Sequence, residues 1–288
     1  MKFIGFAVVL VCVFGGYVLA GGKMSIILKA APLEIMIIMG AAVGAFIIAN
    51  TGHVIKDTLK SLNCLIKPEA HDKNSYQELL SVLFQVFKLA RTKGWLALEA
   101  HIENPEDSSL FGEFPKFQDN HRAITFLCDY LRIISLGNEN PHELEALMDE
   151  EIDTIEQEKM HPNHAVQTMA DGIPALGIVA AVLGVIKTMA AITEPPEVLG
   201  KMIGSALVGT FLGVFLSYGF VGPIAGALGT KGESEVMYFR AIKIALVAFL
   251  NGAAPQVAVD FARKFLPHHL QPSFIELEEI LNELPSPS

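Results

Sequence analysis

The fold is decided by the stretch Gly172–Thr193 (GIPALGIVAAVLGVIKTMAAIT) together with a second apolar run, Met202–Thr230. The second run carries no charged residue, and the first is interrupted only by Lys187. A helix needs ~20 residues to cross the hydrocarbon core of a bilayer, so each run is long enough to span a membrane. A short turn that opens Glu194-Pro195-Pro196-Glu197 joins them. The sequence therefore predicts a transmembrane helical hairpin.

Small residues and hydroxyls fill the interiors of both runs: Gly177, Ala181, Gly184 and Thr188 in the first, and Ala206, Gly209, Thr210, Gly213 and Ser217 in the second. Small residues allow helices in lipid to approach closely. The hydroxyls have two interpretations, because they either bond to backbone carbonyls or line a path for ions or water. Such a path usually contains an acidic group. None of the apolar runs contains one, so we expect a partner helix to supply the carboxylate of any ion path.

Two further apolar runs lie near the N-terminus, Phe3–Gly22 and Ile35–Gly52. The second of these follows Glu34, and Pro32 marks the expected start of its helix. A mean hydropathy of +0.43 and 18% charged residues fit a membrane protein, since soluble domains contain ~25% charged residues. The predicted fold is all-α, a polytopic membrane protein with four transmembrane helices and a helical cytoplasmic domain.

An alternative for the first run is a cleaved signal peptide, which would leave three spans. Lys2 and the segment Val18-Leu19-Ala20 before Gly21 suit that alternative. The run is long for the apolar part of a signal peptide, and we therefore predict a span.

The charged residues are concentrated between Lys56 and Asp171 and after Lys231. This predicts four regions: transmembrane helices 1 and 2 in residues 1–52, a cytoplasmic helical domain in 53–170, transmembrane helices 3 and 4 in 171–230, and a cytoplasmic C-terminal segment in 231–288. Lysine and arginine flanking the spans favour the cytoplasmic side. With both termini inside, most of these residues face the cytoplasm, and only Lys23, Lys29 and Lys201 face outward.

Within residues 53–170, the first helical pattern follows a cap at Asn74-Ser75 and places one apolar stripe inward: Tyr76, Leu79, Leu80, Leu83, Phe84, Phe87 and Ala90. If this helix continues through Gly94, then Arg91, Trp95 and Glu99 are each four residues apart and form one ridge. Such a ridge is either a solvated face or a partner site.

The remaining polar segments also show helical patterns. Residues 111–117 are expected to be a loop and 119–135 a helix with Ile124, Leu127, Cys128, Leu131 and Ile134 inward. Residues 139–158 are expected to form an acidic helix, whose stripe is Leu144, Leu147, Met148, Ile152 and Ile155. Residues 244–259 are interpreted as a buried cytoplasmic helix rather than a fifth span, and 274–284 as an amphipathic segment before a frayed tail. The net charge of −10 argues against nucleic acid as a partner.

Motifs of enzymes and metal sites are missing from the sequence. The three cysteines form no C-x-x-C pair, and there is no phosphate-binding or dinucleotide-binding glycine loop and no G-x-S-x-G. His161 and His164 have a spacing that a metal on a helix could use, but Pro162 disfavours a helix there. We expect no catalytic activity, no cofactor and no metal.

Two prolines, Pro174 and Pro223, lie near the cytoplasmic ends of the hairpin helices. A proline inside a helix frees the carbonyl four residues earlier, here that of Ala170 and of Gly219, and permits a kink. For Pro174 the alternative is an ordinary position in a first helical turn. Pro223, flanked by glycines, is better placed as a hinge.

Across nearly its whole length the chain resembles the MotA family, the membrane subunits of the bacterial flagellar stator. The stretches that carry the resemblance are Val13-Phe-Gly-Gly-Tyr17, Glu103-Asn-Pro105, Glu145-Ala-Leu-Met-Asp-Glu-Glu-Ile152, Pro174-Ala-Leu-Gly-Ile-Val-Ala-Ala-Val182, Val208-Gly-Thr-Phe-Leu-Gly213, Asn251-Gly252 with Pro255, and Pro272-Ser-Phe274 before Glu276-Leu-Glu-Glu279. Each is weak alone, and together they are specific.

The resemblance implies a proton channel in the bacterial inner membrane that drives flagellar rotation. Its implied partners are a MotB-type one-span peptidoglycan-binding subunit, which brings the membrane aspartate, the rotor switch protein FliG, and further copies of this chain in a five-membered ring around a partner dimer, all within membrane lipid. The family's rotor-contact residues match Arg91 and Glu99, and its two functional prolines match Pro174 and Pro223. Its pore-side residues match Ala181 and Thr210.

Two other functions remain open. One is an ExbB- or TolQ-like energiser of envelope transport, which shares the hairpin but normally has three spans. The other is a passive membrane scaffold without ion flow. The four predicted spans and the loop motifs favour the stator, and the few hydroxyls, Thr188, Thr210 and Ser217, favour protons over sodium, which needs several oxygen ligands.

Overall fold

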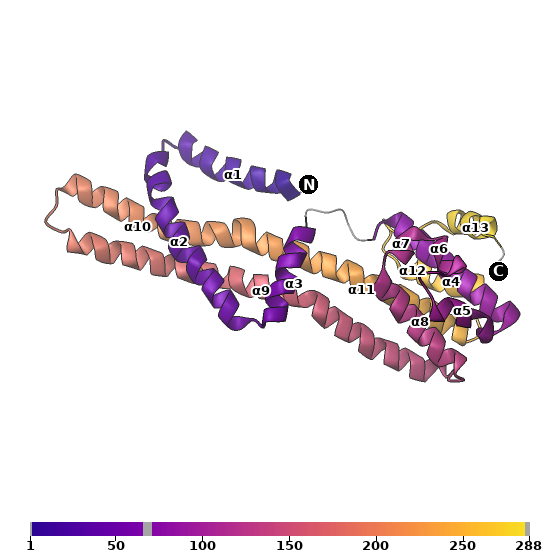
Figure 1. Ribbon diagram of the computed structural model, residues 1–288. Coiled ribbons are helices and arrows are strands. Elements are labelled where there is room, and N and C mark those ends of the chain that lie inside the picture. Colours follow the sequence, from indigo (N-terminus) through magenta and orange to yellow (C-terminus); the bar gives the residue numbers. More distant parts are fainter. Residues whose placement is uncertain (1, 66–70, 286–288) are drawn as a thin grey trace. The chain divides into compact units, whose positions relative to one another are not determined.

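The computed structural model describes residues 2–65 and 71–285, and within these ranges every regular element is a helix. The all-α prediction is therefore confirmed (Figure 1). The predicted frayed tail, residues 286–288, lies outside the described residues. The helices are α1 (Lys2–Leu19), α2 (Met24–Ala49), α3 (Gly52–Cys64), α4 (Lys73–Lys93), η1 (Trp95–Leu98), α5 (Glu99–Glu103), α6 (Ser109–Gly112), α7 (Pro115–Gln118), α8 (His121–Ser135), α9 (Pro141–Ala190), α10 (Pro196–Leu216), η2 (Ser217–Val221), α11 (Gly222–Leu250), α12 (Pro255–Phe265) and α13 (Phe274–Glu283).

The chain divides into two compact units. Residues 1–67 and 160–230 form the first, here the membrane unit, and residues 68–159 and 231–288 form the second, here the polar unit. Helices α9 and α11 each contribute residues to both units. The four regions expected from the sequence remain predictions.

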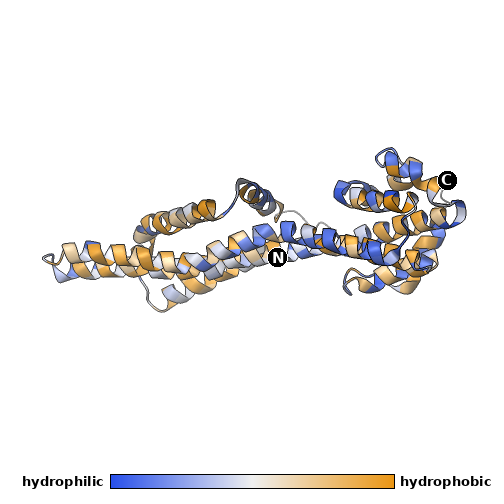
Figure 2. Cartoon of the chain, turned by 90° about the horizontal axis from the view of Figure 1, so that it is seen from below, coloured by the Kyte–Doolittle hydropathy of each residue, from blue (hydrophilic) through white to orange (hydrophobic). Residues whose placement is uncertain are grey.

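Three helical stretches are long and apolar enough to cross a membrane: Met24–Ala49, Pro141–Ala190 and Pro196–Leu250. Figure 2 shows the apolar residues that run along the hairpin helices. The apolar part of α1, Phe3–Leu19, is shorter. A count of four spans therefore remains a prediction, and the membrane character of the chain is clear.

Helix α2 begins at Met24, well before Pro32, so the predicted helix start at Pro32 is wrong. Pro32 lies inside α2, and proline is tolerated inside membrane helices more often than inside soluble ones. The early start places Glu34 inside the span, 8% exposed. The expectation that the spans contain no carboxylate is therefore also wrong.

The hairpin of α9 and α10 packs with its backbones in close contact, as its small residues predict (Figure 1). A Cβ atom on Gly177 would lie 2.8 Å from the Cα atom of Gly213. A Cβ atom on Gly184 would lie 2.9 Å from the Cα atom of Ala206. Any side chain at either glycine would push the two helices apart.

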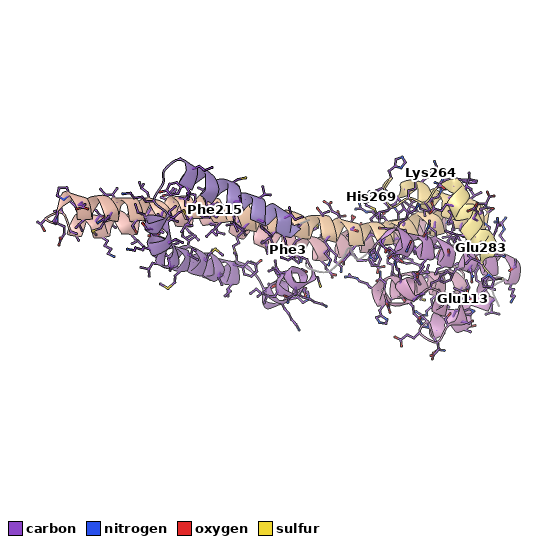
Figure 3. The ribbon with its side chains drawn as sticks, turned by 90° about the horizontal axis from the view of Figure 1, so that it is seen from above. Phe3, Glu113, Phe215, Lys264, His269 and Glu283 are labelled. Atoms are coloured by element: carbon purple, nitrogen blue, oxygen red, sulfur yellow. The ribbon has the colours of Figure 1, made fainter. Side chains whose placement is uncertain are left out.

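Aromatic side chains hold α1 against the hairpin within the membrane unit. Phe6 stacks on Phe220 with ring centroids 5.3 Å apart, and Phe14 meets Phe215 edge-on at 5.3 Å. Figure 3 labels Phe215 on the hairpin and Phe3 on α1. Offset and edge-on aromatic pairs stabilise by about 0.5–1.5 kcal/mol beyond area burial. These contacts position the N-terminal helix beside the segment around Pro223.

The core of the polar unit contains most of the predicted inward faces. On α4 the predicted stripe is buried, with Phe84 partly buried, and on α8 all five predicted residues are buried. On α9, Leu144, Met148, Ile152 and Ile155 are buried, but Leu147 is 49% exposed. The inward prediction for Leu147 is wrong, because the buried positions recur every three or four residues and leave it at the edge of the stripe.

The acidic part of α9 is paired with basic residues from other helices. Glu158 binds Arg122 of α8 at 2.7 Å, and Asp149 binds Lys243 of α11 at 2.7 Å. Glu156 also pairs with Arg240. These pairs are partly exposed and each contributes little alone, but together they explain how an acidic helix packs beside α8 and α11.

Three further expectations about local structure are wrong. Helix α9 continues through His161–His164 with Pro162 inside it. Residues 111–117 include the short helices α6 and α7 rather than one loop. Residues 244–259 are divided by a turn at Gly252, whose φ of +92° ends α11 and is a conformation that glycine adopts without strain.

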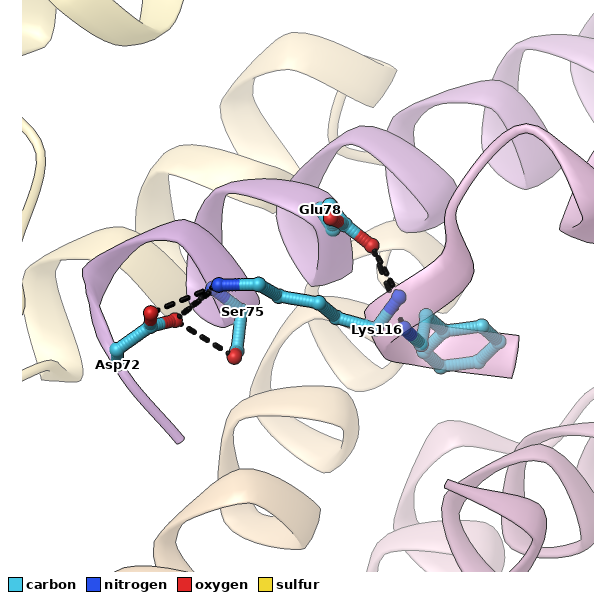
Figure 4. Close-up of polar contacts among 5 residues, drawn as sticks. Asp72, Ser75, Glu78 and Lys116 are labelled. Atoms are coloured by element: carbon cyan, nitrogen blue, oxygen red, sulfur yellow. Dashed lines mark hydrogen bonds and ion pairs between the residues drawn. The ribbon is translucent and has the colours of Figure 1, made fainter. Parts of the chain in front are cut away.

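Helix α4 begins at an Asp72 cap, just before the expected one (Figure 4). Asp72 accepts a hydrogen bond from the backbone N–H of Ser75 at 2.8 Å and pairs with Lys116 at 2.7 Å. The Lys116 ammonium, followed by the Ser75 bonds, lowers the pKa of Asp72 to about 2. Glu78 accepts from the backbone N–H of Lys116 at 2.8 Å, which caps α7. This corner is therefore fixed by carboxylates at two helix starts.

Candidate functional site

Pro174 lies deep inside the fifty-residue helix α9, so the interpretation of Pro174 as a first-turn proline is wrong. The carbonyl that Pro174 frees, that of Ala170, accepts a hydrogen bond from the Ser217 hydroxyl at 2.7 Å. Ala170 and Ser217 are almost fully buried, at 1% exposure each. The predicted hydroxyl and the predicted proline therefore belong to one contact between the two hairpin helices.

Ser217 also begins the π-helical segment η2, Ser217–Val221, directly before Gly222 and Pro223. Single π-helical turns inside α-helices are frequent at functional sites and at kinks. Pro223 lines an apolar cavity of about 380 Å³ with Phe3, Phe6 and Leu62 among its walls. The cavity leaves space beside Pro223, as a hinge requires.

The hydroxyls of the two threonines in the hairpin have different surroundings. Thr188 donates to the carbonyl of Gly184 at 2.9 Å within its own helix. Thr210 is half-buried, and its hydroxyl has no protein partner in the part of the chain that the structure describes. Ala181 lies across from Gly209, since a Cβ atom at position 209 would be 3.0 Å from the Ala181 nitrogen. Ala181 and Thr210 are thus brought to neighbouring positions, and Thr210 keeps a free hydroxyl.

Glu34 is the residue that sequence reasoning missed. Its Oε2 atom is buried and has no hydrogen-bond partner among the described residues, and a Cβ atom on Gly209 would lie 2.7 Å from that atom. The sequence did contain a signal, because Glu34 is the only aspartate, glutamate, lysine or arginine between Lys29 and Lys56. A helix start at Pro32 would place this glutamate at the membrane surface, whereas the longer helix carries it into the span.

Arg91 and Glu99 are both exposed in the polar unit, but they do not lie on one continuous helix. Helix α4 ends at Lys93, because Gly94 has a φ of +82°, and the chain continues as η1 and then α5, which starts at Glu99. The predicted unbroken ridge is therefore wrong.

Arg91 and the neighbouring Trp95 both contact the end of α11. The Arg91 guanidinium donates to the carbonyls of Gly252 at 3.4 Å and Ala253 at 3.2 Å. Trp95 is half-buried and packs edge-on against Phe249 at 5.7 Å. The turn between α11 and α12 therefore fixes the position of the exposed Arg91 guanidinium.

Unlike Arg91 and Glu99, two other titratable groups of the polar unit, His71 and Cys128, are buried. His71 stacks on Tyr238 with centroids 4.2 Å apart, and burial lowers the pKa of His71 to about 4 although Glu235 opposes the change. Burial raises the pKa of the Cys128 thiol to about 12. A thiol in that state is unreactive. Among the described residues, no three His, Cys, Asp or Glu side chains are grouped as a metal site would require.

Comparisons with known proteins cover both units. The family model described as Motility protein A N-terminal matches residues 3–94, and the model of the MotA/TolQ/ExbB proton channel family matches residues 120–241. Motility protein A of Salmonella typhimurium is 42% identical over 285 residues, which are 99% of this chain and 96% of that protein. The chemotaxis protein LafT of Vibrio parahaemolyticus is 38% identical over 282 residues, 98% of each chain.

Two solved structures have the same fold. The flagellar MotAB stator complex from Bacillus subtilis contains a chain that is 28% identical, with a TM-score of 0.68, over 92% of this chain and 95% of that one. The C. jejuni MotAB structure has a TM-score of 0.73 at 20% identity, over the same shares of the two chains. The likeness therefore extends over nearly the whole chain.

Proposed function

The chain belongs to the MotA/TolQ/ExbB proton channel family, in its motility protein A branch, and we propose that its two units divide the work of a flagellar stator between ion conduction and rotor contact. Its function is that of an ion-conducting stator subunit, which couples proton flow across a membrane to torque on the flagellar rotor. The observation that carries this conclusion is the 42% identity to a Motility protein A over 99% of the chain. The family is one of proton channels rather than enzymes.

We assign the ion path to the side of the hairpin that carries Ala181 and Thr210. The free hydroxyl of Thr210 can bond to water or to an incoming carboxylate, whereas Thr188 and Ser217 satisfy backbone carbonyls. The carboxylate comes from a MotB-type one-span subunit that binds peptidoglycan. The Bacillus subtilis relative of known structure is a MotAB complex, which supports such a partner. Five copies of this chain surround a dimer of that subunit.

In this proposal, ion flow is coupled to torque through the hydrogen bond between Ser217 and Ala170, which joins the segment around Pro174 to the segment around Pro223. A charge that crosses the membrane releases ~2.3 kcal/mol per 100 mV, which exceeds the ~1 kcal/mol net strength of one hydrogen bond. Protonation of the partner carboxylate removes a charge from the low-dielectric path. That change shifts the hairpin between two arrangements that differ at Pro174, Ser217 and Pro223.

The polar unit carries the contact with the rotor switch protein FliG through Arg91 and Glu99. Both side chains are exposed, and opposite charges near the surface steer association and fix register more than they add affinity. In this proposal the chain lies in the bacterial inner membrane with both termini and the polar unit in the cytoplasm. An ExbB- or TolQ-like role is less well supported, because the motility-specific N-terminal family matches residues 3–94.

The proposed ion path is tested by motility in a strain that lacks the chromosomal gene and expresses variants of the chain. Thr210→Val removes the free hydroxyl at nearly constant volume, and we expect swimming speed to fall at least several-fold with normal protein level in the membrane. Thr188→Val is the matched control, since its hydroxyl only bonds within its own helix. Equal speeds for the two variants would contradict the assignment of the path to Thr210.

A further inference from the structure

Glu34 is the buried titratable group that the proposed ion path does not use. It lies in α2 of the membrane unit, between Ala30 and Ile38, which belong with Leu212 to one buried apolar cluster. It is 8% exposed, and no hydrogen-bond partner of its Oε2 atom is found in the part of the chain that the structure describes. Carboxylates inside membrane helices are rare and costly, and they usually mark an ion or proton site.

The carboxyl group occupies a notch that exists because position 209 has no side chain. A Cβ atom there would lie 2.7 Å from Glu34 Oε2, 3.0 Å from the Ala181 nitrogen and 3.2 Å from Ala180 Cβ. The notch is thus formed by α10 and α9 together. It lies beside Ala181 and next to Thr210, at the same level of the hairpin as the proposed ion path.

In the described part of the membrane unit, no charged group is paired with Glu34 Oε2. On α10, Glu197 and Lys201 are highly exposed and pair with each other at 3.7 Å. On α9, Asp171 is exposed and accepts from Gln167 at 2.8 Å, and Lys187 is exposed. Lys29 of α2 itself is exposed as well. Among the described residues, no ion pair or hydrogen bond joins any of these groups to Glu34 Oε2.

An unpartnered buried carboxyl oxygen must be satisfied by a proton, by a hydrogen-bond donor or by a counter-charge. Among the described residues, the last two are not found at Glu34 Oε2. We propose that Glu34 is a proton-binding carboxyl group of this chain, distinct from the partner's carboxylate, and that its bound proton keeps α2 packed on the hairpin at Gly209. The step is reversible: the carboxylate takes up one proton from water and releases it without any other reactant.

The chemical test uses dicyclohexylcarbodiimide on the full complex in native membranes. This apolar reagent adds to a protonated carboxyl group, whose proton moves to a reagent nitrogen while the carboxylate oxygen bonds to the central carbon, and the acyl group then migrates to nitrogen as a stable acylurea. We expect mass spectrometry to find the adduct on Glu34 at neutral pH, and to find less of it as the pH rises. Glu34→Gln provides the blank for the same peptide.

Two results of this experiment would overturn the proposal. One is an unmodified Glu34 at every pH while the partner's membrane carboxylate in the same sample is modified. The other is an equal yield with a water-soluble carbodiimide, which would show that Glu34 is open to water. The functional role of Glu34 rests on the proposed ion path. The labelling does not require motility, so it can fail or succeed independently of the proposed function.

The functional test compares swimming speed against external pH. Glu34→Gln keeps the shape of the protonated group but cannot release a proton, so we expect it to insert normally and to swim with a flatter pH response than the unaltered chain. Leu33→Gln, at the exposed neighbouring position, controls for adding an amide to α2. A Glu34→Gln response that matches the unaltered chain over the whole range would contradict a role of this proton in packing. If even the unaltered chain does not restore motility, the proposed stator function is contradicted. The labelling experiment still tests the proton on Glu34, because it does not depend on motility.

Discussion

Ser217 illustrates how much a single side chain contributes to this membrane unit. Its hydroxyl satisfies the Ala170 carbonyl that Pro174 leaves without an intrahelical donor. A buried polar group that loses its partner costs about 1–3 kcal/mol. From the sequence, Ser217 and Pro174 could each be singled out, but their pairing could not, because it joins residues of two helices whose register is set only by packing of the glycines between them.

The pH behaviour of His71 provides a test of packing in the polar unit. Its pKa falls from 6.5 to about 4 in the folded chain because burial disfavours the charged ring. The neutral ring therefore stabilises the folded state above pH 6.5, and this contribution is lost as the pH falls towards 4. Each pKa unit corresponds to about 1.4 kcal/mol.

Histidine C2-hydrogen exchange, followed by mass spectrometry, measures this pKa directly in the full chain. We expect the His71 midpoint to lie well below 6.5 in the folded chain and to return towards 6.5 in denaturant. A midpoint near 6.5 in the folded chain would show that the stacked arrangement with Tyr238 does not persist in solution.

The charges of Arg91 and Glu99 are expected to act on the rotor rather than on folding. Reversal by Arg91→Glu or Glu99→Lys should reduce swimming several-fold with normal protein level, and opposite reversals on the rotor protein should restore part of it. Lys93→Glu, close to Arg91 and also exposed, is the matched control. Loss of the variant proteins from the membrane would contradict this prediction and would show that the two residues stabilise the fold. For Arg91, its hydrogen bonds to the carbonyls of Gly252 and Ala253 would explain that result.

At the scale of the elements, periodicity predicts the inward faces of α4 and α8 but not where helices begin and end. Proline is the main source of error. Local rules make Pro32, Pro162 and Pro174 helix starts or breaks, yet each lies inside a helix. At Pro174 the Ser217 hydroxyl of another helix satisfies the freed Ala170 carbonyl, and a local rule contains no information about such a neighbour. Gly94 is the opposite error, since a positive φ ends a helix that periodicity alone would extend.

The hairpin contact at Gly177 should tolerate no side chain. In Gly177→Ala the new methyl group would lie 2.8 Å from the Gly213 backbone, so the helices must separate, at a cost of about 1–3 kcal/mol. Gly172→Ala, on the same helix with nothing within 4 Å, is the control. Thermal unfolding in detergent should show a lower Tm for Gly177→Ala alone. Equal Tm values would show that α9 and α10 pack less closely than described.

At the scale of the whole molecule, the apolar stretches and the distribution of lysine and arginine predict a membrane topology with both termini in the cytoplasm. After replacement of the three native cysteines, we expect Lys23→Cys and Glu194→Cys to react with an impermeant maleimide added outside spheroplasts. Lys93→Cys in the polar unit should react only after the membrane is permeabilised. Labelling of Lys93→Cys in intact spheroplasts would reverse the proposed orientation.

The measurement that tests the central claim most directly is the swimming speed of cells that depend on this chain, with sodium and the proton-motive force varied separately. If proton flow drives torque, speed persists in sodium-free medium at a fixed proton-motive force and collapses with an uncoupler at every sodium concentration. Speed that follows sodium and survives the uncoupler would contradict the account.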